Sequence, residues 1–223
     1  MSQAITPAQL QEWLLLYADR IHEQESLLTE LDAAIGDADH GINMQRGMTK
    51  VRQRLTEMNG NEPGIAALLR SVAMTLISSV GGAAGPLYGA FFLRAAKDVN
   101  GNQVLSLVEL ATMFRSGLDG IQQRGKAKLD DKTMVDALQP AVVALEDAAT
   151  SGKSVLKALN SARQAAEAGM KHTSELEAKK GRASYMGPRS IGHQDPGATS
   201  LYFLIETAAL TLGHIQNNNS QEN

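Results

Sequence analysis

The amino-acid sequence predicts an all-α fold, a bundle of roughly eight helices. Apolar residues recur at spacings of three and four along most of the chain, which is the helical period. Strand signals are weak, and no hairpin dipeptide separates two alternating runs. Glycines gather in a few long connections, and alternate connections of an up-and-down bundle lie at the same end. These connections are residues 35–41, 81–89, 125–133 and 181–197, and we expect several of them to converge on one ligand.

The N-terminal part is predicted to hold three helices. Thr6-Pro7 is an N-cap followed by a first helical residue, and Gly36 ends the apolar period that follows. The second helix is expected over residues 41–58, after which Asn59-Gly60 marks a turn. The third begins near Pro63. Its last residues, 76–80, fit a short strand and a helix end equally well.

The remaining chain predicts five helices within the same domain. They are expected over residues 87–97, 107–125 after a Ser106 cap, 133–150, 154–180 with a break near Gly169, and 197–213. No repeat or linker marks a boundary, so residues 1–216 are predicted to form a single domain. Residues 217–223 are polar and are expected to fray.

The composition mainly excludes certain classes of function and of chemical site. The chain has 223 residues, 43% of them apolar, and a net charge of -3, so it offers no large basic field for nucleic acid or an anionic membrane. It has no cysteine, which excludes disulfides, thiolate metal sites and cysteine nucleophiles. No signal peptide or bilayer-length apolar run is found. A cytoplasmic protein is expected.

Three aspartates, Asp32, Asp37 and Asp39, gather where the first predicted helix ends. Negative charge there opposes the helix dipole, so a cation that offsets it would stabilise the turn. Mg²⁺ prefers oxygen ligands, and three carboxylates could hold two ions against a phosphate chain. A solvated acidic turn explains the same residues without a metal, with Asp39 capping the next helix and His40 as a hydrogen-bond partner.

The stretch Gly81-Gly82-Ala83-Ala84-Gly85 precedes a helix and is a candidate phosphate cradle. Glycine lets the backbone approach a ligand closely, and the amides at a helix start point at anions. The stretch is neither a Walker loop, since no Gly-Lys-Ser/Thr follows, nor a dinucleotide fingerprint, since no βαβ unit surrounds it. A tight turn that lets two helices pack closely is the alternative.

Residues 181–198 combine two arginines, a histidine, a tyrosine and an aspartate with four glycines. Arginine forks suit phosphate oxygens, and a polar loop of this length inside a compact domain is usually functional or disordered. Asp195 is expected to cap the last helix with Pro196 at its first position. In the connection at residues 125–133, Asp131 is interpreted first as a cap for the following helix. Met134 reads first as a core residue, although methionine can also face an adenine ring.

Taken together, these motifs resemble the L subunit of dihydroxyacetone kinases, the ADP-binding subunit. The resemblance covers nearly the whole chain, and its motifs are long and ordered. They are GDADHG at 36–41, NMQRG at 43–47, GGA at 81–83, DKTM at 131–134, GRASY at 181–185 and GHQDPGA at 192–198.

The resemblance implies an eight-helix barrel with ADP or ATP bound in the loops at one end. Two Mg²⁺ ions would be held by Asp32, Asp37 and Asp39. Arg182 would be the catalytic residue that neutralises charge developing during phosphoryl transfer. The nucleotide would be surrounded by His40, Gly41, Ile42, Asn43, Ala83, Ala84, Gly125, Met134, Arg182, Asp195, Pro196 and Gly197.

The same resemblance implies that the acceptor, dihydroxyacetone, is held by a separate K subunit, which also carries the histidine that binds it. In split forms of the family, ADP stays bound and is rephosphorylated by an M subunit of the phosphotransferase system, whose phosphate derives from phosphoenolpyruvate. A chain with only the nucleotide domain favours this form. Alternatives are free ATP as donor, another small ketose or a fatty acid as acceptor, a regulatory subunit that contacts a transcription regulator, and a metal-free helical scaffold.

Two positions depart from the family pattern. Ala84 stands where family members often have serine, so a hydroxyl contact to phosphate is lost while the backbone amides remain. Asp130 stands where they often have glycine, directly before the Asp-Lys-Thr-Met run. We expect this second departure to alter the loop that leads to Met134.

Overall fold

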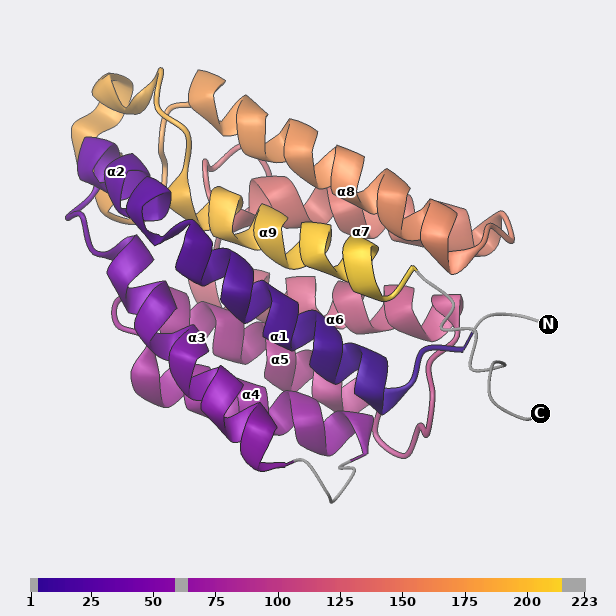
Figure 1. The fold of residues 1–223 in the computed structure, drawn as a ribbon. Coiled ribbons are helices and arrows are strands. Elements are labelled where there is room, and N and C mark those ends of the chain that lie inside the picture. The colour runs from indigo at the N-terminus through magenta and orange to yellow at the C-terminus, as the bar shows by residue number, and fades with distance from the viewer. Residues whose placement is uncertain (1–3, 59–63, 214–223) are drawn as a thin grey trace, which may run out of the picture.

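The computed structural model describes residues 4–58 and 64–213, and it confirms the all-α fold (Figure 1). Within these residues there is no β-strand, only an isolated antiparallel bridge between Ile5 and Leu105. The described part of the chain contains nine α-helices: α1 Pro7–Glu23, α2 Glu25–Ile35, α3 His40–Glu57, α4 Ile65–Ser79, α5 Ala84–Asp98, α6 Leu107–Gly125, α7 Met134–Thr150, α8 Val155–His172 and α9 Pro196–Thr211.

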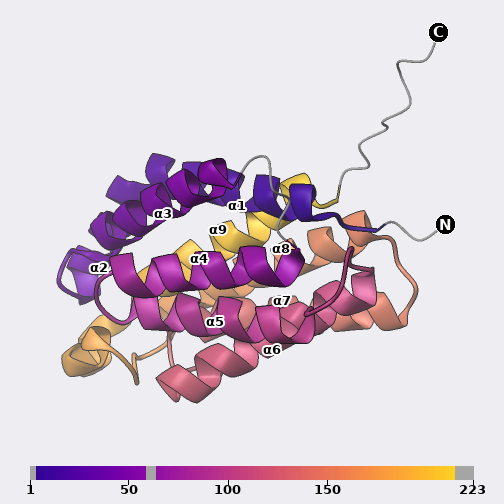
Figure 2. The ribbon, with the colours of Figure 1, turned by 90° about the horizontal axis from the view of Figure 1, so that it is seen from below.

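Eight of these helices form a closed ring, which confirms the predicted barrel. Each of α1, α3, α4, α5, α6, α7, α8 and α9 contacts the next, and α9 returns to α1 (Figures 1 and 2). Two hydrogen bonds join the ends of the ring: Trp13 Nε1 donates to the Leu204 carbonyl at 2.9 Å, and the Tyr17 hydroxyl donates to the Ser200 carbonyl at 3.2 Å. The remaining helix, α2, lies outside the ring and contacts α3 and α9 at one end of it (Figure 1).

The middle of the ring is filled by large side chains. Trp13, Tyr88, Phe91 and Phe114 are fully buried, and the rings of Phe91 and Phe114 meet edge to face with centroids 5.7 Å apart. Burial of a large apolar side chain stabilises a fold by about 1.5–3 kcal/mol. A packed centre leaves the ends of the barrel as the place for a ligand.

The predicted helix starts are confirmed where a capping residue was visible in the sequence. Thr6 and Ser106 each form a reciprocal capping box, with Gln9 and Glu109 respectively. Ser154 and Asp195 also accept a hydrogen bond from the first turn of α8 and α9. Asp131 is different: Thr133 caps α7, and Asp131 Oδ2 accepts from the Lys128 N–H at 3.0 Å, so its prediction as a cap is wrong.

The first predicted helix is two helices. It breaks at Gln24, whose φ of -108° and ψ of 13° are not helical, and α2 then turns across the end of the ring. Neither glycine nor proline marks the break. The chain there reads His-Glu-Gln-Glu, so it carries no apolar residue that would keep the helix against the core.

Two other predicted boundaries shift, and a third is decided between two alternatives. Helix α8 ends at His172 and not at Lys180, and Gly169 lies inside it without a break. Residues 76–79 form the end of α4, so the helix end is correct of the two alternatives that the sequence left open. Helix α5 begins at Ala84, three residues earlier than expected, because Pro86 is tolerated in a first helical turn.

Some predictions fall on residues 59–63 and 214–223, which lie outside the described residues. They are the Asn59-Gly60 turn, the helix start at Pro63 and the polar tail 217–223. Across the part of the chain that the structure describes, every helix is too short or too polar to cross a bilayer.

Candidate functional site

Four connections meet at one end of the barrel and enclose a cavity of about 550 Å³. They are the α2–α3, α4–α5, α6–α7 and α8–α9 connections, so the predicted convergence is confirmed. A ligand cavity of this size is within the range for small molecules and cofactors. The predicted site residues that line it are Asp32, Asp37, Asp39, His40, Asn43, Ala83, Ala84, Gly125, Met134, Arg182, Asp195, Pro196 and Gly197.

Two predicted site residues do not line the cavity. Gly41 is buried between α2 and α3, where a β-carbon would lie 2.1 Å from the Glu25 carbonyl oxygen. Ile42 is half exposed on the outside of α3. Gly41 therefore serves the close packing of two helices, and nothing in its surroundings points to a ligand.

The three aspartates come together on one side of the cavity. One carboxylate oxygen from each of Asp32, Asp37 and Asp39 lies within 4.8 Å of the others. Ala38 between them has a φ of 61°, a left-handed conformation that folds the short turn back on itself. An all-oxygen donor set of this kind fits Mg²⁺ better than Zn²⁺, which usually takes histidine or cysteine.

The cap of α3 comes from Asp32 and not from Asp39. Asp32 Oδ2 accepts from the Asp39 N–H at 2.8 Å and from the His40 N–H at 3.1 Å. Asp39 occupies the N-cap position, yet its side chain makes no capping hydrogen bond. Its carboxylate therefore remains available to a cation.

Arg182 reaches the acidic cluster from the α8–α9 connection. Its Nη2 lies 3.0 Å from Asp37 Oδ2, and the side chain is 68% exposed. Residues 182–190, labelled η2, form 3₁₀ turns on either side of a kink at Gly187. Ala183 and Met186 of the first turn pack beside Ile35 of α2. The arginine is thus held over the cavity mouth by apolar contacts to α2.

The α4–α5 connection uses its glycines in both of the ways that the sequence left open. A β-carbon on Gly85 would lie 2.4 Å from the Val80 carbonyl oxygen, so this glycine allows close packing. Gly82 has a φ of 65° and open space where a side chain would stand. It turns the backbone so that Ala83 and Ala84, at the start of α5, line the cavity. The amides of a helix start favour anions.

His40 is a hydrogen-bond partner deep in the site. Its Nε2 lies 2.9 Å from Ser200 Oγ, which lies 2.8 Å from the Tyr88 hydroxyl. Burial lowers the pKa of His40, although the charges of Asp32 and Asp39 oppose this. The imidazole is therefore neutral near pH 7 and contributes hydrogen bonding, not positive charge.

Asp195 caps α9 and also faces the cavity. Its Oδ2 accepts from the Ala198 N–H at 2.7 Å. Burial raises the pKa of Asp195 to about 7, and the charges of Asp136 and Asp32 add to the increase, while the Ala198 N–H and Lys132 oppose it. Desolvation thus disfavours the charged form of this carboxyl.

Met134 and its neighbours form an apolar wall. Met134 is only 4% exposed, belongs to the core and also lines the cavity, so both roles considered for it are compatible with the structure. The other apolar side chains on this wall had no motif to mark them in the sequence. They are Ile35, Leu87, Ile121 and Val135.

Sequence reasoning also missed three cations that line the cavity: Arg124, Lys132 and Lys180. Lysines and arginines beside glycine or aspartate usually belong to solvated loops, so nothing in the local pattern separated them from surface residues. Lys132 is not a surface residue in the structure, because it is only 1% exposed. Its place inside the Asp-Lys-Thr-Met run was the sequence feature that could have identified it.

A family model and the curated relatives of this chain agree with one another. A family model described as the DAK2 domain matches residues 34–210. The chain is 46% identical over 207 residues to the "PEP-dependent dihydroxyacetone kinase, ADP-binding subunit DhaL" of Escherichia coli K12, covering 93% of this chain and 98% of that protein. It is 42% identical over 197 residues to the "PTS-dependent dihydroxyacetone kinase, ADP-binding subunit DhaL" of Lactococcus lactis, covering 88% and 93%.

Longer proteins contain a similar region. The human "Triokinase/FMN cyclase" is 34% identical over 177 residues, which cover 79% of this chain and 30% of that protein. The crystal structure of the dihydroxyacetone kinase from C. freundii in complex with AMP-PNP and Mg²⁺ has a similar fold, with a TM-score of 0.73 at 24% identity. It matches 94% of this chain, which spans 35% of that one.

Proposed function

Since the chain belongs to the DAK2-domain family, we propose that it is the ADP-binding subunit of a PEP-dependent dihydroxyacetone kinase. Support comes from relatives of that name that are matched over almost their entire length. The observation that carries the proposal is the cavity where four connections converge, with three carboxylates on one side. Such a site can hold a metal-bound nucleotide at the end of a rigid barrel.

Mg²⁺ and nucleotide would occupy different parts of this cavity. Asp32, Asp37 and Asp39 would hold the metal, as one or two ions, because their oxygens converge within 4.8 Å. The amides at the start of α5, around Ala83 and Ala84, would face the phosphates. The base would lie toward the apolar wall that includes Met134. His40, Asn43, Gly125, Asp195, Pro196 and Gly197 would complete the surroundings.

The protein's part in phosphoryl transfer would be positioning and charge compensation. When bound, Mg²⁺ supplies Lewis-acid stabilisation of the phosphate oxygens. Arg182 would neutralise negative charge that grows on the transferred group, since its guanidinium is exposed at the cavity mouth and already offsets Asp37. His40, held neutral by burial, would donate or accept a hydrogen bond without adding charge.

The acceptor would be dihydroxyacetone held by a partner K subunit. The relatives are named PEP-dependent and PTS-dependent, which supports phosphoenolpyruvate and the phosphotransferase system as the source of phosphate. We propose that an M subunit of that system would recharge the bound ADP. Binding of a transcription regulator is a further proposal that no residue described above favours. An acceptor other than dihydroxyacetone has less support, because this chain covers only about a third of the L-erythrulose kinase that it resembles, 31% of its length.

Two measurements test the proposal. Native mass spectrometry of the purified chain should show ADP that survives dialysis against Mg²⁺ buffer. Addition of K and M subunits should then give phosphoenolpyruvate-dependent formation of dihydroxyacetone phosphate, with free ATP a poor substitute. Transfer that requires stoichiometric ATP and not phosphoenolpyruvate would support the alternative donor, and no transfer with either donor would reject the function.

A further inference from the structure

We propose that Lys132 is a positioning residue for the nucleotide site, because its ammonium closes the base of the connection that carries Arg182. The inference rests on the proposed function for its consequence, since the positioned groups are those that would meet the nucleotide. The closure itself stands on contacts of the described residues alone.

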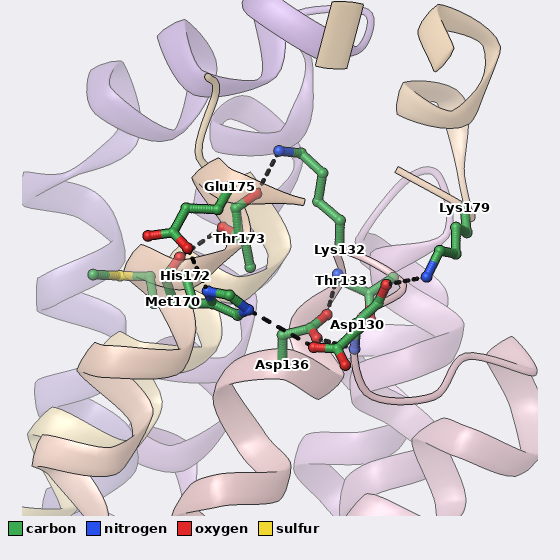
Figure 3. A network of polar contacts seen from close by, with 9 residues as sticks. All are labelled: Asp130, Lys132, Thr133, Asp136, Met170, His172, Thr173, Glu175 and Lys179. Carbon is green, nitrogen blue, oxygen red and sulfur yellow. Dashed lines mark hydrogen bonds and ion pairs between the residues drawn. The ribbon is translucent and has the colours of Figure 1, made fainter. Parts of the chain in front are cut away.

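The ammonium of Lys132 is buried and fully engaged. The residue is 1% exposed, and its Nζ donates to the backbone carbonyls of Thr173 at 2.5 Å, Leu176 at 3.2 Å, and His193. A lysine ammonium has three donors and no acceptor. All three are therefore used on one connection, and Figure 3 shows the side chain extended toward Thr173.

These carbonyls lie at the two ends of the connection between α8 and α9. Thr173 and Leu176 leave α8, and His193 precedes α9, so one side chain joins chain segments that are 17 residues apart or more (Leu176 to His193). Two bonds reinforce the closure: the Gly192 N–H donates to the Ser174 carbonyl at 2.8 Å, and the Asp195 N–H donates to Thr173 Oγ1 at 3.0 Å. Residues 177–191 are thereby held as a loop with a closed base.

The backbone that presents Lys132 is itself fixed. Lys132 has a φ of 60°, and the turn before α7 is held by Asp136, which accepts from the N–H groups of Asp130 at 2.6 Å and Thr133 at 2.7 Å. Lys179 of the loop donates through Nζ to the Asp130 carbonyl at 2.8 Å. Figure 3 shows these residues as one continuous network. The loop is therefore anchored to the α6–α7 connection, which also lines the cavity.

A direct role on phosphate does not fit this geometry. Contact with an anion would require Lys132 to give up a carbonyl, and a buried polar group without a partner costs about 1–3 kcal/mol. Among the residues that the structure describes, no carboxylate pairs with the ammonium directly. Burial lowers the pKa of Lys132 below its usual range, and the nearby charges of Asp195 and Asp136 offset this lowering only in part. The three carbonyls around Nζ match the three donors of an ammonium, so the lysine serves as a tie between them.

The tie controls two parts of the site. The loop that it closes carries Arg182 over Asp37, and the segment after it carries Asp195, the cap of α9. Without the ammonium, three carbonyls at the base would lose their donor and turn toward water. Arg182 would then lose its fixed position at the cavity mouth.

The first test is tryptic cleavage of Lys132→Met, with Lys128→Met as matched control. Lys128 is an exposed lysine of the same connection that does not line the cavity. We expect cleavage after Lys180, Arg182 and Arg189 to be at least tenfold faster in Lys132→Met, with cleavage within α8 and the control unchanged. Unchanged loop cleavage, or acceleration at all sites alike, would overturn the inference.

The second test is a double-mutant cycle on ADP affinity, measured by calorimetry with Mg²⁺. Lys132→Met should weaken ADP binding about tenfold, and it should add little, less than twofold, in an Arg182→Ala background. Coupling of this kind between residues that share no contact indicates that one acts through the other. Full additivity would mean that Lys132 acts independently of the loop, and would overturn the inference.

A measurement on the unaltered protein keeps the proposal testable should the variant fail to fold. Amide hydrogen exchange at Gly192 and Asp195 should be as slow as in the middle of α8, because both amides lie in the closed base. Fast exchange at these two amides would overturn the closure. If the protein does not bind ADP at all, the proposed function fails, while cleavage and exchange still decide the role of Lys132.

Discussion

Asp32 and Asp37 contribute differently to the acidic cluster, although both carboxylates face the same point. Asp32 caps α3 through two backbone amides, so its charge also stabilises the fold. Asp37 has an ion pair with Arg182 and makes no capping bond. The two positions therefore separate stability from ligand binding.

Asp37→Asn should weaken Mg²⁺-dependent ADP binding at least tenfold and change the free energy of unfolding by about 0.5 kcal/mol or less. The amide keeps the shape of the side chain but removes a charged oxygen ligand. Calorimetry with ADP and urea unfolding measure the two effects, and Asp147→Asn, an exposed aspartate on α7, is the control. Equal ADP affinity for Asp37→Asn and the control would remove Asp37 from the metal site.

Asp130 lies at a position whose backbone conformation favours glycine. Its φ of 67° lies in the left-handed region, where a side chain is strained. The Asp130 N–H donates to Asp136 Oδ1, and the Asp130 carbonyl accepts from Lys179 Nζ. The strained residue is thus held by two hydrogen bonds, and an effect of this departure on the loop before Met134 stays a prediction.

Substitution at Asp130 tests this interpretation. Asp130→Gly should change stability by less than about 1 kcal/mol, because relief of strain is offset by the greater freedom of glycine in the unfolded chain. Asp130→Val should destabilise by roughly 1–2 kcal/mol, since a β-branched residue resists this conformation. Thermal unfolding of both variants is the measurement. A valine variant as stable as the glycine variant would contradict the strain.

At the scale of helices, apolar period and capping residues predicted most of what the structure contains. These local patterns failed where contacts between distant residues determine the end of a helix. The period continued through Gln24, yet the chain turns there so that α2 can cover the end of the ring. It also continued beyond His172, where Thr173 leaves the helix to bond Asp195. Neither partner is visible to a local pattern.

Gly169 was expected to break a helix, and its actual role predicts an unusual response to alanine. A β-carbon there would lie 2.0 Å from the Asp136 carbonyl oxygen on α7. Gly169→Ala should destabilise by about 1–3 kcal/mol through overpacking, although alanine is intrinsically the better helix former. Ala168→Gly, on the exposed side of α8, should cost about 1 kcal/mol by propensity alone. Urea unfolding compares them, and a stabilised Gly169→Ala would refute the close contact.

The capping box of α6 predicts a pH dependence. The N–H and hydroxyl of Ser106 hold the pKa of Glu109 below its usual range. A depressed carboxyl pKa contributes stability above the unfolded pKa, about 4.3, and loses it as the pH falls through the folded value. The stability advantage over Glu109→Gln should therefore be constant from pH 7 to about 5 and shrink below about 4. Chemical unfolding at several pH values measures it, and an advantage that grows in acid would contradict the sign.

For the whole molecule, the site is a product of topology more than of any one motif. The cation Arg124 and the apolar wall of Ile121 and Leu87 could not be assigned from their local sequences. They became site residues only when α5, α6 and α7 were placed around one cavity. The convergence of the glycine-rich connections, in contrast, followed from their alternation along an up-and-down bundle, and the structure confirms it.

A ligand that joins four connections should stabilise the barrel as one unit. ADP with Mg²⁺ at 100 times its dissociation constant adds about 2.7 kcal/mol, which for a domain of this size raises Tm by roughly 5–11 °C. Removal of Mg²⁺ with EDTA should abolish most of the shift. Differential scanning calorimetry with and without EDTA is the measurement. An equal shift in EDTA would show that the metal does not hold the nucleotide.

The closure of the ring by α9 against α1 has a consequence for folding during synthesis on the ribosome. Trp13 and Tyr17 find their backbone partners at Leu204 and Ser200, nearly two hundred residues later in synthesis. Until that last helix has left the exit tunnel, the apolar side of α1 faces a gap in the wall. We expect the nascent chain to need a chaperone during this interval. The ring can close, and the cavity can form completely, only after α9 has been translated.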